Sequence, residues 1–186
     1  SIEAVSGEVD IEDLIPEETC VFTLTHEGYI KRTTLDTYQA QNRGGRGVQG
    51  MTQKDEDFTE EMYVGSTHDY MLFLTNQGRV YRLKGYQVPE GSRTAKGSHI
   101  VNLLQLQEGE SVTLMLQQKA DVDEDNTYAT MITKQGLIKR TPLSQFRNIR
   151  KAGLIAIALN EGDSLVWSHL TKGDDEIIVA THDGAA

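Results

Sequence analysis

The sequence of 186 residues contains a single cysteine, no long apolar run and few aromatic residues. A single cysteine cannot form an internal disulfide, so a reducing compartment is expected, and we interpret Cys20 as a small apolar residue at the start of a strand. The printed sequence shows neither the ~18 apolar residues that span a bilayer nor a charged-then-apolar opening segment. These absences argue against a disulfide-stabilised scaffold and a helical membrane protein. They predict a cytoplasmic location and no membrane partner.

Positive charge is also in the minority, with 18 Lys and Arg against 28 Asp and Glu, and the formal net charge is -10. A uniformly acidic surface would repel the phosphates of nucleic acid. Net charge says nothing about distribution, however. The distribution depends on how the chain is organised.

One template recurs along the chain, in VFTLTHEGYIKR (21–32), MLFLTNQGRVYR (71–82) and TMITKQGLIKR (130–140). EIIVATHDGAA (176–186) begins a fourth copy. In each copy an apolar run of strand-forming residues leads into Thr-x-x-Gly, and in the first three an alternating segment with arginine follows. This pattern predicts a β-hairpin whose glycine takes a positive φ, at Gly28, Gly78, Gly136 and Gly184.

The first three copies continue alike, with an aromatic residue, a basic glycine-bearing stretch, a short apolar run, an acidic turn and a further strand. The period is about fifty residues, and no convincing helix is expected beyond the acidic opening segment. Such spacing predicts an all-β, propeller-like module with blades of about four strands around an axis. The expected repeats lie near 20–66, 70–118, 128–171 and 176–186, which gives three blades and the start of a fourth.

The basic residues follow this repeat. The windows 28–47, 78–97 and 134–153 hold fifteen of the eighteen Lys and Arg but only two acids, Asp36 and Glu90. If the repeats are equivalent blades, these windows form a basic band on an acidic body. The candidate DNA-binding residues in the band are Lys31, Arg32, Arg43, Arg46, Arg79, Arg82, Lys84, Arg93, Lys96, Lys139, Arg140, Arg147, Arg150 and Lys151.

Such a band predicts binding of duplex DNA through its backbone, largely independent of sequence. Few aromatic residues alternate with the basic ones, which argues against stacking on single-stranded bases. No recognition helix for a major groove is evident.

No metal, nucleotide or catalytic site is predicted. The segment DVDEDN (121–126) lacks the glycine of an EF-hand loop and has Ile132 where the bidentate glutamate belongs. The five histidines lack the spacing of metal ligands. Gly45, Gly47 and Gly50 fit G-x-G-x-x-G, but no amphipathic helix follows, and GSRTAKGS lacks the order of a Walker A loop. No nucleophile, base and acid stand out as a set.

The stretch QNRGGRG is the most specific motif, and it consists of Gln41, Asn42, Arg43, Gly44, Gly45, Arg46 and Gly47. With the blade template from about Glu17 onward, it resembles the C-terminal β-pinwheel domain of the DNA gyrase A subunit, part of a type IIA topoisomerase. That family has the heptapeptide Q-[R/K]-R-G-G-[R/K]-G, from which Asn42 departs by losing one positive charge. The resemblance implies a linker from the breakage–reunion domain at 1–16 and a partial pinwheel at 17–186, with three blades and part of a fourth of an expected six.

The resemblance implies a domain that wraps duplex DNA around a basic rim and so supports ATP-dependent negative supercoiling. It implies partners in the gyrase B subunit, together with the rest of the gyrase A subunit, in an A2B2 holoenzyme of the bacterial cytoplasm associated with the chromosome. The catalytic tyrosine, ATP and Mg would belong elsewhere in that enzyme, leaving no cofactor in this domain. One alternative is the equivalent domain of the topoisomerase IV A subunit, and another is a propeller-like protein-interaction scaffold. A more distant alternative is a hydrolase or transferase built on such a ring.

Overall fold

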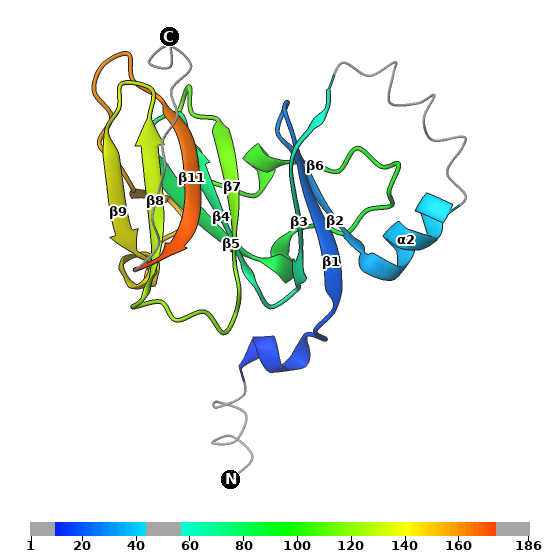
Figure 1. Cartoon of the computed structure of the whole chain (residues 1–186). Helices are drawn as coiled ribbons and strands as arrows, with labels where there is room; N and C mark the ends of the chain where they lie inside the picture. Colours follow the sequence, from blue (N-terminus) through cyan, green and yellow to red (C-terminus); the bar gives the residue numbers. More distant parts are fainter. Residues whose placement is uncertain (1–9, 44–56, 174–186) are drawn as a thin grey trace.

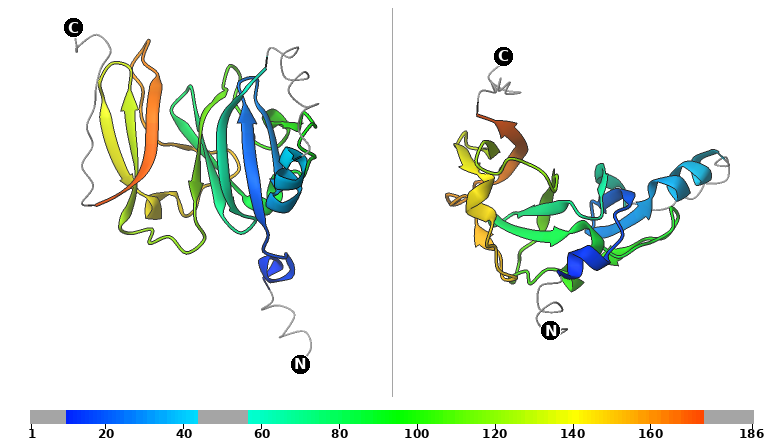
Figure 2. Two further views of the ribbon diagram at one scale, coloured as in Figure 1. Left: turned by 45° about the vertical axis from the view of Figure 1, so that its right-hand side comes forward. Right: turned by 90° about the horizontal axis from the view of Figure 1, so that it is seen from below.

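The structure is a computed structural model and describes residues 10–43 and 57–173. Three antiparallel sheets stand side by side along an arc (Figures 1 and 2). This arrangement confirms the predicted all-β blades. The start of the fourth copy, 176–186, lies outside the described residues.

The three sheets are called blades 1 to 3 in chain order. Blade 1 has the strand order β3-β1-β2-β6, formed by β1 (Thr19–Thr25), β2 (Tyr29–Thr34), β3 (Thr59–Ser66) and β6 (Ser98–His99). Blade 2 has the order β10-β5-β4-β7, formed by β4 (Tyr70–Thr75), β5 (Arg79–Lys84), β7 (Val112–Gln118) and β10 (Leu154–Ile155). Blade 3 has the order β11-β8-β9, formed by β8 (Thr127–Thr133), β9 (Ile138–Pro142) and β11 (Leu165–Lys172). Short 3-10 helices are η1 (Ile11–Leu14), η3 (Gly85–Gln87), η4 (Ile100–Asn102) and η5 (Leu143–Phe146).

Each blade is built on a hairpin whose turn is the repeated Thr-x-x-Gly. The glycines have φ values of 91°, 75° and 95° at Gly28, Gly78 and Gly136, a region that glycine occupies at little cost. Each glycine N–H donates a 3.0 Å hydrogen bond to the carbonyl of the threonine three residues earlier. The threonine hydroxyl accepts from the N–H four residues after it, over 3.0 to 3.3 Å. The template therefore encodes a turn closed by one threonine, and the predicted hairpins are confirmed in the three described copies.

The fourth strand of blades 1 and 2 comes from the next repeat along the chain. β6 pairs with β2, and β10 pairs with β5, both antiparallel. The carbonyl of Gly28 accepts from the N–H of Ile100 at 2.8 Å, and that of Gly78 accepts from Ala156 at 2.9 Å. Each repeat therefore donates a short strand to the preceding blade, and this strand links neighbouring repeats in addition to their side-chain packing.

The structure corrects one prediction, because Leu35–Arg43 forms helix α2 where no helix was expected. The Thr34 hydroxyl accepts from the N–H of Thr37 at 3.3 Å, as an N-cap does. Asp36 lies in the first turn, where negative charge interacts favourably with the helix dipole. The residues YQAQNR then supply several good helix formers.

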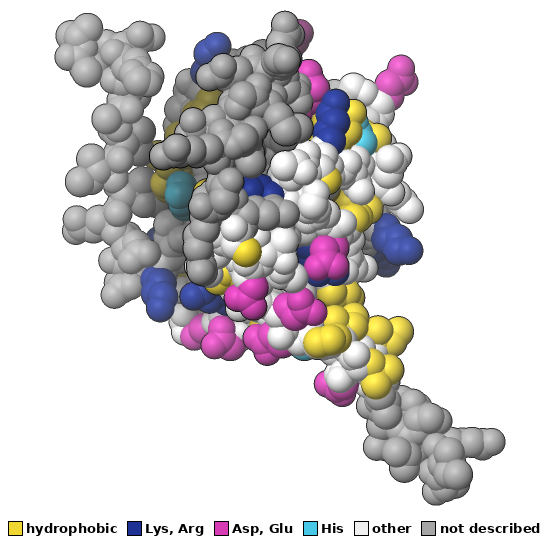
Figure 3. Space-filling model, turned by 90° about the vertical axis from the view of Figure 1, so that its right-hand side faces the viewer, with side chains coloured by type: hydrophobic (Ala, Val, Ile, Leu, Met, Phe, Trp, Pro, Cys, Tyr) yellow, Lys and Arg dark blue, Asp and Glu magenta, His cyan; other side chains and the backbone are white. Residues whose placement is uncertain are grey.

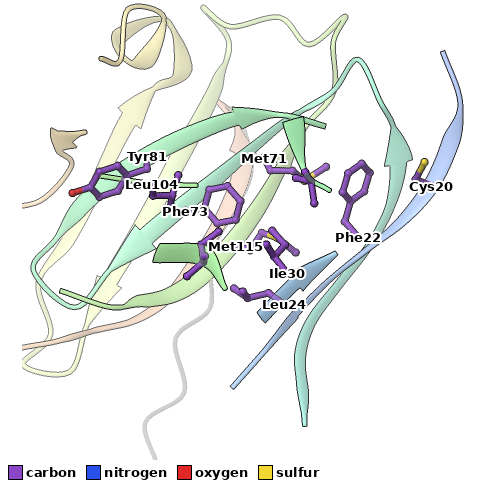
Figure 4. Packing of buried hydrophobic residues seen from close by; sticks show 11 residues of the cluster. Cys20, Phe22, Leu24, Ile30, Met71, Phe73, Tyr81, Leu104 and Met115 are labelled. Atoms are coloured by element: carbon purple, nitrogen blue, oxygen red, sulfur yellow. The ribbon is translucent and has the colours of Figure 1, made fainter. Parts of the chain in front are cut away.

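Two apolar clusters fill the spaces between blades. Strand β4 serves both, since Met71 and Phe73 face the cluster shared with blade 1 while Leu72 and Leu74 face the one shared with blade 3. Figure 4 shows the first cluster, in which Cys20 is fully buried near the start of β1. The interpretation of Cys20 as a buried apolar residue is confirmed.

Candidate nucleic-acid interface

Two basic loops lie at the outer edge of the arc. Strand β7 contacts both β3 and β11, so these strands converge on the inner side, whereas β6 and β10 form the opposite edges of their sheets. The residues before β6 and β10 therefore occupy equivalent outer positions on adjacent blades. We name them basic loop 2 (residues 88–97) and basic loop 3 (residues 147–153).

The cations of these loops are displayed in different ways. In basic loop 2, the Arg93 guanidinium lies over the Tyr38 ring at 4.8 Å, and Lys96 Nζ lies over Tyr29 at 4.4 Å. In basic loop 3, Arg147, Arg150 and Lys151 are exposed, and Arg147 Nε is 3.4 Å from the Glu124 carboxylate. Such contacts orient a cation while leaving its charge at the surface.

A cavity of about 760 Å³ opens beside basic loop 3. Arg150 and Lys151 line it together with residues 101–107, and Tyr81 and Glu110 also contribute to its wall. Among the described residues, the side chains of Arg150 and Lys151 make no hydrogen bond or ion pair. Both cations are therefore available to an anion at the outer edge.

Predicted cations on the strands are held more tightly by the protein itself. Lys31 Nζ donates to three loop carbonyls, and burial, reinforced by Arg93, lowers the pKa of Lys31. Lys139 Nζ donates to the carbonyl of Ala156 at 2.9 Å. Lys84 Nζ pairs with Glu12 of η1 at 2.8 Å, which fastens the opening segment to blade 2. These ammonium groups have protein partners that a phosphate would have to displace.

An arginine follows each turn glycine by four residues, and it takes the same place in each blade. We call these three residues, Arg32, Arg82 and Arg140, the template arginines. Arg82 lies over the Tyr70 ring at 4.0 Å, and Arg140 over the Tyr128 ring at 4.3 Å. In blade 1 the equivalent partner is Cys20. Burial raises the pKa of its thiol, and a hydrogen bond with Arg32 opposes that rise. A template arginine therefore packs across its own blade.

The heptapeptide is only partly described. Its first three residues, Gln41, Asn42 and Arg43, are the last residues of α2. Gly44, Gly45, Arg46 and Gly47 lie outside the described residues. The assignment of this stretch and of the basic residues to DNA stays a prediction.

Three acids with a structural role were interpreted in the sequence only as parts of acidic turns. Asp57, Glu110 and Asp163 take equivalent places beside the hairpin turns. Glu110 accepts from the Thr75 hydroxyl at 2.7 Å, whereas Asp57 and Asp163 each accept, at 2.9 Å, from the N–H two residues after the hairpin threonine. Burial raises the pKa of Asp163, but the neighbouring Thr133 hydroxyl and hydrogen bonds from the backbone N–H groups of Gln135 and Ser164 outweigh it and bring the pKa below the usual value. The signal in the sequence was their recurrence before the last strand of each repeat.

The visible described surface on the blade 1 side of the molecule carries charges of both signs. Figure 3 shows acidic side chains gathered along the lower part of that face, with Lys and Arg side chains around them. Within residues 10–43 and 57–173, no group of three or more His, Cys, Asp or Glu could hold a metal ion. No helix in the same ranges has the length and apolar character to cross a membrane.

Interlocked antiparallel blades, with basic loops on the outer edges of two of them, define a β-propeller-type repeat protein. The family model for the DNA gyrase C-terminal domain, beta-propeller, matches residues 21–64, 69–118 and 128–172. The chain belongs to this DNA gyrase C-terminal domain family.

Relatives and solved structures agree with the family. The chain is 52% identical over its full length to the DNA gyrase A protein of Clostridium acetobutylicum, and 49% identical over 98% of its length to that of Halalkalibacterium halodurans. It spans 22% of the length of each relative. The crystal structure of the C-terminal domain of DNA topoisomerase IV superposes with a TM-score of 0.69 at 29% identity, covering 86% of this chain and 47% of that one. A DNA gyrase A C-terminal domain structure gives 0.59 at 22% identity, covering 84% and 49%, and supports the fold alone.

Proposed function

We propose that this chain is the part of a gyrase A subunit that binds and wraps duplex DNA, supporting ATP-dependent negative supercoiling. The observation that carries the proposal is the equivalent placement of basic loops 2 and 3 on the outer edges of adjacent blades. A row of cations on a curved edge suits a polyanion that follows the curve.

Two physical effects decide whether DNA is wrapped: the release of counterions favours binding, and the bending of DNA opposes it. Each phosphate neutralised by Lys or Arg releases condensed cations from DNA, which favours binding most at low salt. Smooth bending of a 20–30 bp site by 40–90° costs on the order of 1–6 kcal/mol, so several contacts along the arc are needed to hold the bend. The acidic remainder of the chain would confine DNA to the cationic edge.

In the proposed setting the partners are duplex DNA, the gyrase B subunit, which binds in the same complex, and the rest of the gyrase A subunit. The complex would work in the bacterial cytoplasm. The catalytic tyrosine, ATP and Mg would lie in those other parts. The chain would contribute no bond-making residue of its own.

A second candidate is the equivalent domain in the A subunit of a topoisomerase IV, favoured by the TM-score of 0.69. The retained heptapeptide positions and the gyrase A relatives near 50% identity favour gyrase. Sealing a nicked plasmid with ligase while the protein is bound separates the two. Wrapping shifts the topoisomer distribution, whereas binding without wrapping leaves it in place.

The binding test uses fluorescence anisotropy with a duplex at several salt concentrations. Reversing Arg150 and Lys151 together to Glu should weaken binding and lower the salt slope by about 0.9 per lost phosphate contact. The matched control reverses Lys119 and Lys172, which lie outside the basic windows. An equal loss in the control, or binding that is insensitive to salt, would contradict a cationic rim.

A further inference from the structure

The same attachment holds the start of both basic loops. In blade 1, Arg32 Nε donates to the carbonyl of Val88 at 2.7 Å. In blade 2, the equivalent Arg82 donates from Nη2 to the carbonyl of Arg147, also at 2.7 Å. Arg32 and Arg82 thus each reach out of their own repeat and hold the loop of the next one.

A second cation holds each loop further along. Lys31 Nζ donates to the carbonyls of Ser92, Arg93 and Ala95 at 2.9, 2.5 and 2.8 Å. Arg79 Nη2 donates to the carbonyl of Ala152 at 2.5 Å. Both loops are therefore clamped at two points by a pair of strand cations from the preceding repeat.

For Lys31, these contacts use every donor that a phosphate would need. An ammonium group has three N–H donors, and the three carbonyls around Lys31 account for all of them. Arg82 is also stacked on Tyr70, which fixes the plane of its guanidinium. In contrast, Arg150 and Lys151 are exposed on the loop that Arg79 and Arg82 hold.

We propose that Lys31, Arg32, Arg79 and Arg82 are positioning residues that hold the two basic loops, whose own cations contact DNA. The contacting cations are Arg93, Lys96, Arg147, Arg150 and Lys151. The inference rests on the proposed function, since it divides one predicted set of DNA-binding residues into two roles. A loop ordered before binding loses less conformational entropy when it meets a phosphate, so the clamps raise affinity without touching DNA.

A double-mutant cycle on the full chain tests this division. Arg82→Met removes a clamp, Arg147→Met with Arg150→Met and Lys151→Met removes the contacts of basic loop 3, and all four changes are then combined. We expect Arg82→Met alone to weaken duplex binding roughly three- to tenfold. Because Arg82 acts through the loop, the combined variant should bind no more than about twofold worse than the contact variant.

Hydrogen exchange without DNA supplies the independent measurement. Amides of residues 147–153 should exchange at least about tenfold faster in Arg82→Met, while those of β1 and β2 keep their rates. Lys31→Met provides the same test on basic loop 2, should Arg82→Met fail to fold, and Lys119→Met is the control for loss of one exposed charge. Fully additive affinity losses, or unchanged loop exchange, would overturn the proposal. If the parent chain does not bind duplex DNA, the proposed function fails, while loop exchange still decides whether these residues are clamps.

Discussion

The hydroxyl of Thr75 donates a 2.7 Å hydrogen bond to Glu110 Oε2, and both residues are almost fully buried, at 0% and 8% exposure. The other carboxylate oxygen accepts from the Tyr81 hydroxyl at 2.5 Å and from the Gln107 N–H at 2.8 Å. One acid thus joins the β4–β5 turn, strand β5 and the segment that leads into β7. The energetic cost of burying the Glu110 carboxylate is offset by these three donors and by Arg79, whose Nε lies 3.8 Å away.

Replacing Glu110 with Ala should destabilise the protein by about 3 kcal/mol or more, because buried donors lose a charged acceptor. Urea unfolding of both proteins measures the difference. Glu108→Ala, an exposed neighbour, should stay within about 0.5 kcal/mol of the parent. A similar loss in both variants would show that the network around Glu110 has no special weight.

Acidification should weaken the turn of blade 3 through Asp163. Its pKa is lowered in the folded state, so its stabilising effect is present above the ordinary value of 3.8 and is lost as pH falls through the folded pKa. Melting temperature against pH should therefore fall less steeply below that value in Asp163→Asn than in the parent. Asp121→Asn, a change at an exposed carboxylate, should leave the slope as it is. Parallel curves for the parent and Asp163→Asn would refute the linkage.

Two glycines at equivalent turns should differ in their response to a methyl group. Gly136→Ala meets no atom within 4 Å and should cost about 1–2 kcal/mol from its positive φ alone. A Cβ at Gly78 would also meet the carbonyl oxygen of Ile157, next to the donated strand β10, and should add about 1–3 kcal/mol. Thermal or urea unfolding of the pair measures this difference. Equal costs would mean that the backbone next to the donated strand β10 shifts to accommodate the methyl group at little energetic cost.

In the full domain, changing Arg43, Gly44, Gly45, Arg46 and Gly47 together to Ala should abolish wrapping but spare most of the affinity. The other blades keep their cations, whereas the bend needs every contact along its path. A gel shift measures affinity, and a topoisomer shift or end-to-end FRET measures bending. Intact bending in this variant would reduce the heptapeptide to a structural connection.

The sequence was sufficient where a local rule decides the structure. Thr-x-x-Gly specified the hairpins because the turn is closed by hydrogen bonds within five residues. The donated strands could not be predicted in the same way, since Ser98–His99 and Leu154–Ile155 have two residues each and pair with a strand of the preceding repeat. Helix α2 had a recognisable start at Thr34, which the repeated strand pattern concealed.

The candidate site was predicted by composition more than by role. Counting Lys and Arg placed them in recurring windows, but it did not separate Arg82, bound to a carbonyl and stacked on Tyr70, from exposed Arg150. That difference depends on which backbone carbonyls the fold brings within reach. It is set by tertiary packing, which no spacing along the chain reports.

The donation of a strand to the preceding repeat has a consequence for how such arrays grow by tandem duplication. Each repeat brings a hairpin with an open edge and a short strand that completes the hairpin before it, as β6 completes β2 and β10 completes β5. When one whole repeat is inserted or deleted, every hairpin inside the array still receives one completing strand from the repeat that follows it. A change in blade number by whole repeats thus needs no new pairing rule, whereas a cut inside a repeat leaves a neighbour one strand short.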